Sequence, residues 1–390
     1  MSLSIADLAR DESLRRTHFP VTAHRTFLSH AAVSPLPACA TQALDWFGQQ
    51  ASEDQQEGPA VFHRVLGTRV VAAQLLGCQA QEIALLGPTA MGLNLVADGL
   101  DWQPGDEVVY YRDDYPANVY PWTKLAARGV RPVSVRPERP GEITWEVVEA
   151  SLTPRTRLVA LASAHFLTGF RIDVDTIGRR LHERGILFCL DAIQTLGAFP
   201  LSVEHVDFLS ADSHKWMLGP LGAGIFYVRE SLFDRLRPTH LGSWNVWSPN
   251  FIAQEDLNRF YEGGRRYECG SLNLPGILGM RAPLEMILAL GVGAIAARIR
   301  ELRNHTLLRL GAADWHPVWG PDLPEAHVSG IITFPLDGRN PEALVAKLAA
   351  ARVSVAVRHN REGAPHLRVA PHFYSTEAEI DRLAEVLESS

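Results

Sequence analysis

The stretch VDFLSADSHKWMLGPLGAGIFYV, residues 206–228, joins two apolar runs through a turn rich in glycine and proline. Lys215 stands in that turn and is one of only three lysines in the chain, whereas arginine is abundant. The other two, Lys124 and Lys347, fall in helical patterns among charged residues, as surface lysines do. A desolvated lysine has a lowered pKa, and its neutral amine can condense with an aldehyde. The position of Lys215 therefore indicates a chemical role.

The composition limits the classes of protein to which the chain can belong. The chain has 390 residues, 46% of them hydrophobic, and a net charge of −7. This length allows one large domain and a smaller one, each with its own core. Charges of both signs are mixed along the chain, which gives no support for binding nucleic acid or a membrane surface. The longest uncharged apolar run, residues 286–297, is too short to span a bilayer.

The four cysteines are widely spaced and form no Cys/His cluster at metal-ligand spacing, so no metal site is predicted. Cysteines used in this way are mostly small buried hydrophobic residues of a reduced protein. We therefore expect a soluble, cytoplasmic protein.

Seven short apolar runs alternate with helical patterns in the first two thirds of the chain. The runs are 82–88, 106–112, 130–137, 157–164, 186–191, 206–212 and 223–229. Helical patterns lie between them, for example at 121–129 and 173–185. This alternation predicts an α/β fold with a mostly parallel seven-stranded sheet between helices.

The pattern changes after about residue 275. A long helical pattern at 276–312 is followed by shorter strand and helix patterns, which predict a small α+β unit. We expect residues 1–20 to pack near this small domain, residues 21–265 to form the large domain, and residues 266–390 to form the small one.

Ligands of an open parallel sheet lie beyond the carboxyl ends of its strands. Thr89 follows the first strand in a turn that opens a helix, and a helix start suits a phosphate. Tyr115 follows the second strand. Asp191 closes an apolar strand, with Gln194 one turn later. Taken singly, each residue has a structural alternative: an ordinary capped helix, a packing aromatic, or a helix N-cap.

Together with Lys215, these residues match the needs of pyridoxal 5′-phosphate. This cofactor requires a lysine for its Schiff base, a carboxylate against its pyridine nitrogen, a phosphate cup at a helix start and a side chain that stacks on its ring.

At these residues the chain resembles the class V aminotransferase family of fold-type I pyridoxal-phosphate enzymes. That family includes cysteine desulfurases, selenocysteine lyases, kynureninases and isopenicillin N epimerase. The central match is LDAIQTLG (190–197) followed by 210–228. Further matches, in family order, are FLSHAAVSPLP (27–37), GPTAMGLNLVA (87–97), DYPANVYPW (114–122), FLTGFRIDV (166–174), ECGSLNLPGILG (268–279) and LRVAPHFYSTEAEID (367–381).

The resemblance implies roles for the residues at matching positions in the cofactor-binding large domain. Lys215 would carry the Schiff base and move the substrate proton, while Asp191 would pair with the pyridine nitrogen. Gln194 would bond the ring hydroxyl, and Tyr115 would stack on the ring. The phosphate cup would comprise Thr89, the backbone of Ala90 and Met91, His214, and Ser213 or Asp212. Asp212 is a departure from the family, because a carboxylate repels phosphate unless it turns away or pairs with a cation.

The resemblance also implies a substrate end and a homodimer with shared active sites. Ser271 would reach the phosphate of the neighbouring subunit. Arg368 would bind the substrate α-carboxylate through its guanidinium fork, and His30 and Ala31 would lie at the edge of the substrate. The family pattern often has a polar residue beside the ring hydroxyl, where this chain has Phe166 and Leu167; the nearby His165 is either a packed residue or a functional one.

The segment 357–369 lacks the nucleophilic cysteine that cysteine desulfurases carry shortly before this arginine. The nearest cysteine, Cys269, belongs to a different segment, so a persulfide relay is disfavoured. The pattern favours β-elimination of a sulfur or selenium substituent from an amino acid. Transamination, epimerisation and hydrolytic Cβ–Cγ cleavage remain as alternatives, because these branches share most active-site residues. A non-catalytic descendant that binds the cofactor is the alternative of another class.

Overall fold

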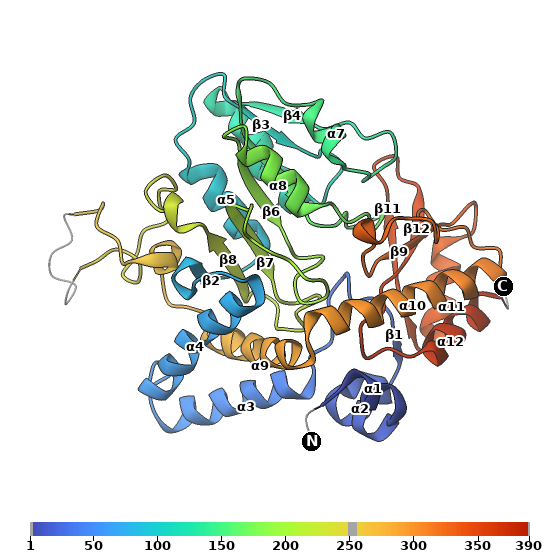
Figure 1. The fold of residues 1–390 in the computed structure, drawn as a ribbon. Helices are drawn as coiled ribbons and strands as arrows, with labels where there is room; N and C mark the ends of the chain where they lie inside the picture. The colour runs from blue at the N-terminus through green and yellow to red at the C-terminus, as the bar shows by residue number, and fades with distance from the viewer. Residues whose placement is uncertain (1–2, 249–255, 389–390) are drawn as a thin grey trace.

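A seven-stranded sheet forms the centre of the computed structural model, which describes residues 3–248 and 256–388 (Figure 1). The strands lie in the order β2-β8-β7-β6-β5-β3-β4. Their bounds are Ile83–Leu86 (β2), Glu107–Tyr110 (β3), Arg131–Ser134 (β4), Thr156–Ala162 (β5), Leu187–Asp191 (β6), Phe208–Asp212 (β7) and Gly224–Val228 (β8). Strands β3 to β7 pair in parallel, and β8 runs antiparallel to β2 and β7. The seven predicted strands and the mostly parallel α/β fold are confirmed.

The central strands of the sheet are buried on both faces because they are apolar at nearly every position, whereas the edge strand β4 is partly exposed. In β6, Phe188 and Leu190 point to one face and Leu187 and Cys189 to the other, as the two-residue period of a strand requires. The first face packs against helices α4, α8 and α9, and the second against α5 and α6. The helices of this region are α3 (Ala38–Glu53), α4 (Pro59–Leu76), α5 (Thr89–Gly99), α6 (Tyr120–Thr123), α7 (Trp145–Glu149), α8 (Val174–His182) and α9 (Leu274–Leu290).

A second, smaller core lies at the C-terminal end of the chain. Its sheet has the order β11-β12-β9, with strands Ile332–Pro335 (β9), Ala356–His359 (β11) and Pro365–Val369 (β12). A separate parallel pair joins β1 (Thr26–Phe27) to β10 (Val353–Ser354). The helices here are α10 (Val292–Ala312), α11 (Pro341–Ala350) and α12 (Glu377–Glu388).

The predicted helix over 276–312 is two helices, α9 and α10, which meet at an angle of 84°. Gly291 lies between them with φ of +81°, a left-handed conformation that ends α9 and that few other residues adopt at low cost. Figure 1 shows α10 running from the central sheet toward α11 and α12. Helix α9 follows the predicted domain boundary at residue 265 but packs on the core of the central sheet. The division into domains stays a prediction.

The N-terminal helices α1 (Ile5–Arg10) and α2 (Glu12–His18) contact the C-terminal segment (Figure 1). Arg15 of α2 pairs with Glu379 of α12 at 2.9 Å, and the Phe19 ring stacks on the Tyr374 ring with centroids 3.9 Å apart. Among the described residues, no single helix is long and apolar enough to cross a bilayer, and α9 and α10 reach that threshold only as a bent pair.

Candidate active site

A cavity of about 300 Å³ lies beyond the carboxyl ends of β6 and β7, between the central sheet and the β11-β12 hairpin. It gathers residues from segments far apart in sequence. Ten predicted site residues line it: Ala31, Thr89, Ala90, Tyr115, Asp191, Gln194, Asp212, His214, Lys215 and Arg368. The predicted residues His30, Met91, Ser213 and Ser271 do not line it. A cavity therefore does lie beyond the carboxyl ends of the strands, as predicted.

Lys215 is held by its backbone so that its side chain enters the cavity. Ser34 donates from Oγ to the Lys215 carbonyl at 2.7 Å and from its backbone N–H to the His214 carbonyl at 2.7 Å. The Nζ atom lies 5.4 Å from the centroid of the Tyr115 ring. Burial lowers the pKa of Lys215, although the nearby Asp191 opposes the shift. At physiological pH the fraction of neutral amine is therefore larger for Lys215 than for an exposed lysine. A nucleophilic amine must be neutral.

Two buried carboxyls interact near Lys215: Asp191 lines the cavity, and Asp114 does not. Asp191 ends β6 and accepts a hydrogen bond from the Ile193 N–H at 3.0 Å. Burial raises its pKa, and the neighbouring Asp114 raises it further. Asp114 itself accepts bonds from the Tyr115 N–H at 2.7 Å and from the Asn118 side chain at 3.0 Å, and burial raises its pKa to about 6. A cationic ring nitrogen placed against Asp191 would offset this excess of negative charge.

Sequence reasoning overlooked Asp114, although it directly precedes Tyr115 in a segment matched to the family. The signal that could have revealed Asp114 is its position as a carboxylate shortly after a strand. Through its bond to the Tyr115 N–H, Asp114 fixes the backbone from which the Tyr115 ring projects.

The first turn of α5 forms the end of the cavity suited to phosphate. Thr89 is the first residue of α5, and its Oγ1 accepts a bond from the Asp212 N–H at 2.9 Å. Helix α5 can approach β7 closely because it carries Gly92, where a Cβ atom would lie 2.5 Å from the Ser210 Oγ. The Met91 N–H, by contrast, donates to the Pro88 carbonyl at 2.8 Å, and the Met91 side chain is exposed. The structure therefore does not bring Met91 into the cup.

The Asp212 carboxylate lines the cavity and contacts its own loop. One oxygen accepts a bond from the Gly222 N–H at 3.2 Å, and the other lies 2.9 Å from His214 Nδ1. The second contact is short enough for an ion pair but is not aligned as a hydrogen bond. The Asp212 carboxylate is thus held by its loop beside the His214 ring, and its role toward a phosphate stays a prediction. Ser213 is fully buried and donates to the Pro220 carbonyl, so it stabilises this loop.

Gln194 joins three segments at the wall of the cavity. Its Nε2 donates to the Ala31 carbonyl at 3.2 Å, and its Oε1 accepts from Trp216 Nε1 at 3.1 Å. An amide group has a further donor hydrogen and a further lone pair, so Gln194 can still bond a ring hydroxyl.

Arg368 on β12 closes the opposite end. It is buried, and its Nη1 donates to the Phe166 carbonyl at 2.5 Å, whereas its buried Nε has no hydrogen-bond partner. Burial and the nearby Arg358 lower its pKa to about 9. Across residues 3–248 and 256–388, no carboxylate pairs with this guanidinium. A buried, incompletely bonded guanidinium is suited to a carboxylate ligand.

Two histidines named from the sequence are structural. His30 is fully buried, with Nδ1 at 2.8 Å from the Ala370 carbonyl and Nε2 at 2.7 Å from the Tyr374 hydroxyl. Both ring nitrogens already have protein partners, so the structure does not support the prediction that His30 lies at the edge of the substrate. His165 is also packed, and burial lowers its pKa to about 4.

The residues of this cavity fit pyridoxal phosphate. Lys215 supplies the amine, Asp191 a buried carboxylate, the first turn of α5 the anion site and Tyr115 an aromatic face. Arg368, with its unpartnered Nε, leaves a place for an acidic substrate group.

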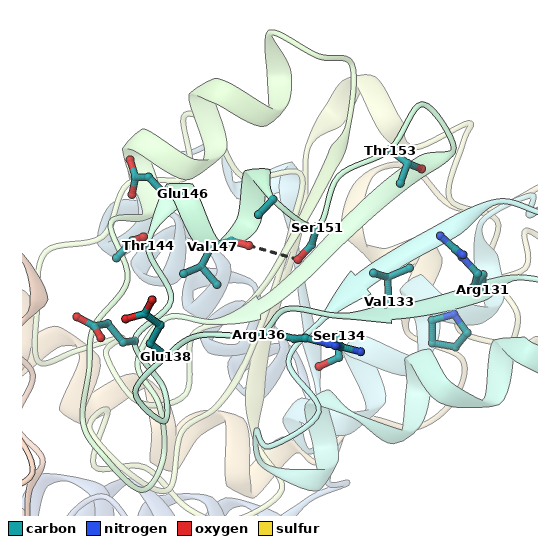
Figure 2. A pocket seen from close by; sticks show the side chains of 13 residues that line it. Arg131, Val133, Ser134, Arg136, Glu138, Thr144, Glu146, Val147, Ser151 and Thr153 are labelled. Atoms are coloured by element: carbon teal, nitrogen blue, oxygen red, sulfur yellow. Dashed lines mark hydrogen bonds between the residues drawn. The ribbon is translucent and has the colours of Figure 1, made fainter.

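A larger hollow of about 930 Å³ lies at the edge of the sheet, between β4 and α7 (Figure 2). It is lined by charged and small polar side chains such as Arg136, Glu138 and Ser151, and it contains none of the predicted site residues. Size alone would have selected the wrong place.

The family model described as aminotransferase class-V matches residues 26–383. A probable cysteine desulfurase of Methanothermobacter thermautotrophicus is 26% identical, over 97% of this chain and 98% of the relative. An isopenicillin N epimerase of Streptomyces clavuligerus is 29% identical, over 93% and 94%. The apo structure of a cysteine desulfurase from Thermococcus onnurineus NA1 superposes with a TM-score of 0.88 at 24% identity, covering 96% of each chain.

Proposed function

The chain belongs to the aminotransferase class-V family and is a pyridoxal-phosphate enzyme, and from this premise we propose that it acts at Cα of an amino acid and eliminates a sulfur or selenium substituent from Cβ, without a cysteine persulfide. One observation carries this proposal: the cavity combines Lys215, Asp191 and Arg368, and no cysteine of the described chain lines it.

The properties of the cysteines support elimination without a protein persulfide. Burial raises the pKa of Cys39 to about 11 and that of Cys78 to about 12, and it also raises the pKa of the fully buried Cys189 well above the usual value of a thiol. Thiols of this kind are poor nucleophiles at neutral pH. Cys269, the fourth cysteine, does not line the cavity, so we expect the substituent on Cβ to leave without transfer to a protein sulfur.

The side chains of the cavity divide the work of such a reaction. When bound, the cofactor supplies an electron sink for the bonds at Cα. Arg368 orients the substrate through its α-carboxylate, and the Lys215 amine takes the Cα proton. Asp191 keeps the ring nitrogen protonated. The Cβ–S or Cβ–Se bond then breaks with its electron pair on the leaving atom, and water releases the remaining carbon skeleton as a 2-oxo acid and ammonia.

Epimerisation is the second candidate, because a relative that covers most of the chain is named isopenicillin N epimerase. It uses the same proton abstraction but returns a proton to the other face of Cα. Transamination shares the first step as well.

An amino-acid panel with three readouts separates these reactions. We expect release of a 2-oxo acid together with sulfide or selenide. Incorporation of solvent deuterium at Cα without net product would favour epimerisation instead, and dependence on an added 2-oxo acid would favour transamination. A colourless protein that takes up no pyridoxal phosphate would overturn the whole proposal.

Replacing Arg368 with alanine is expected to raise KM for the substrate about tenfold to a hundredfold, because a charge-assisted contact to the α-carboxylate is lost. Steady-state kinetics measure the effect. Arg368→Lys should recover only part of it, since an ammonium group cannot form the bidentate contact. An unchanged KM in Arg368→Ala would mean that the α-carboxylate is bound elsewhere.

Replacing Cys269 with serine is expected to leave kcat within about twofold of the wild type. Cys269 does not line the cavity, so the exchange touches no reacting group. The assay is release of the 2-oxo acid. Loss of activity in Cys269→Ser would revive the persulfide mechanism.

We also propose a homodimer with shared active sites. Ser271 lies outside the cavity of its own chain, which is consistent with a contact to the site of a second copy. Val33 and Tyr115 line the cavity yet are about half exposed, and Leu221, in the loop after Lys215, is 62% exposed. Exposed apolar residues around one site are typical of an interface. Light scattering during size-exclusion chromatography tests the dimer.

A further inference from the structure

Trp216 directly follows Lys215 in the chain and contacts the cavity only through Gln194. Both side chains are buried, but Gln194 lines the cavity and Trp216 does not. The indole Nε1 of Trp216 donates to the Gln194 Oε1 at 3.1 Å, and the Gln194 Nε2 donates to the Ala31 carbonyl at 3.2 Å. Both ends of the Gln194 amide are therefore held by protein groups.

These two partners select one orientation of the Gln194 amide. An indole nitrogen can only donate a hydrogen bond, and a backbone carbonyl can only accept one. An amide turned by 180° would place its NH₂ group against the Trp216 N–H and its oxygen against the Ala31 carbonyl, so that like groups would face each other. In the orientation that the structure shows, one hydrogen on Nε2 remains for a ligand in the cavity.

The Trp216 indole is itself held in place by the C-terminal part of the chain. Gly330 makes room for it, because a Cβ atom at that position would collide with the indole ring. The Trp216 carbonyl lies 3.1 Å from His372 Nε2, and His372 Nδ1 accepts a bond from the Phe373 N–H at 2.9 Å. The hydrogen of the His372 ring is therefore on Nε2, which donates it to Trp216. The indole is thus a fixed donor behind Gln194.

The orientation of Gln194 matters because the ring oxygen of pyridoxal phosphate exists either as a hydroxyl or as an oxyanion. A hydrogen bond donated to the oxyanion stabilises that form. The remaining Gln194 N–H is such a donor, and the bond from the indole to the other end of the same amide strengthens it by polarisation. Without the indole, the Gln194 Oε1 would be a buried acceptor that has lost its partner. It would then gain by turning toward the cavity, where a protonated ring hydroxyl donates to it.

We propose that Trp216 is a positioning residue that acts through Gln194 to keep the ring oxygen of the cofactor in its oxyanion form. The inference rests on one part of the proposed function, the assignment of Gln194 to this oxygen. It holds whichever reaction follows at Cα of the substrate.

The absorbance of the Trp216→Phe holoenzyme tests the inference. Phenylalanine keeps an aromatic ring beside Gly330 and removes the hydrogen-bond donor. We expect the visible band, which belongs to the form with a deprotonated ring oxygen, to lose intensity to the near-ultraviolet band of the protonated form. The wild type should keep the visible band under the same conditions.

A binding measurement gives a second readout that does not depend on activity. The affinity for pyridoxal phosphate is divided by the affinity for its 3-deoxy analogue, which lacks the ring hydroxyl. We expect this ratio to fall about twofold to tenfold in Trp216→Phe, because the hydrogen bond to the ring oxygen is weakened. Gln194→Ala should lower the ratio as well, and the double variant should lose little more, since both substitutions remove the same interaction.

Two further variants make the result specific. Trp102→Phe is the matched control, because Trp102 is also buried and its Nε1 donates to the Ala97 carbonyl at 2.8 Å, away from the cavity. It should keep the wild-type spectrum and the wild-type ratio. Gly330→Ala leaves the indole in the chain but displaces it, and it should change both readouts in the same direction as Trp216→Phe. If Trp216→Phe does not fold, Gly330→Ala decides.

The outcomes separate this inference from the proposed function. A wild-type spectrum and ratio in Trp216→Phe, or in Gly330→Ala where that variant decides, would overturn the inference if Gln194→Ala is altered in both. Unchanged readouts in Gln194→Ala would remove the assignment of Gln194 to the ring oxygen, and the inference with it, while the reaction at Cα would stand. A chain that takes up no pyridoxal phosphate would overturn the proposed function itself.

Discussion

Lys215→Ala is expected to reduce turnover by about a thousandfold or more, because the variant lacks both the amine that condenses with the cofactor and the base that takes the Cα proton. Arginine cannot replace it, since a guanidinium stays protonated and does not condense with an aldehyde. Lys215→Arg should therefore be as inactive as Lys215→Ala while keeping the positive charge between Asp191 and Arg368.

Borohydride reduction gives a readout that does not depend on activity. It should fix the cofactor on the peptide that contains residue 215 in the wild type and on no peptide in Lys215→Ala. The chain has only three lysines, so mass spectrometry assigns the site without ambiguity. Lys124→Ala is the matched control: Lys124 is exposed, pairs with Asp98 at 2.7 Å, and should be dispensable. Full activity in Lys215→Ala would remove the Schiff-base assignment.

The sheet could be predicted because its strands are apolar on both faces and are separated by helical patterns. Runs such as 186–191 leave few alternatives, since a strand buried on both sides is apolar at nearly every position. The prediction of one long helical pattern over 276–312 was wrong in one respect, since the segment forms two helices. Its apolar residues continue through Gly291, and hydrophobic periodicity alone does not report that a glycine adopts a positive φ.

The residues that touch the cavity at strand ends were predictable, and those that act through pairing across strands were not. Asp191 and Lys215 follow strands, and their residue types are unusual at those positions. Arg358 has no such local signal, because its place beside Arg368 follows from the β11-β12 register. His30 shows the reverse error. It neighbours Ala31, which does line the cavity, but its own ring points into a buried contact with Tyr374.

Asp191→Asn is expected to lower kcat by at least about a hundredfold, because preorganised charge at a developing charge commonly contributes that much. Asparagine has nearly the same shape and can keep the bond from the Ile193 N–H, so the fold and the cavity should persist. Only the negative charge that we propose lies against the ring nitrogen is lost. Without it the ring nitrogen gives up its proton, and the cofactor no longer stabilises negative charge at Cα.

A chemical rescue separates this electrostatic role of Asp191 from a structural one. A cofactor analogue methylated on its ring nitrogen carries a permanent positive charge and needs no carboxylate to hold a proton. Reconstitution of Asp191→Asn with this analogue should restore part of the lost kcat, whereas the same analogue should not activate Lys215→Ala. Borohydride should still fix the natural cofactor on residue 215 in Asp191→Asn, since Lys215 is unchanged. Wild-type kcat in Asp191→Asn would show that another group, such as the neighbouring Asp114, holds the ring proton.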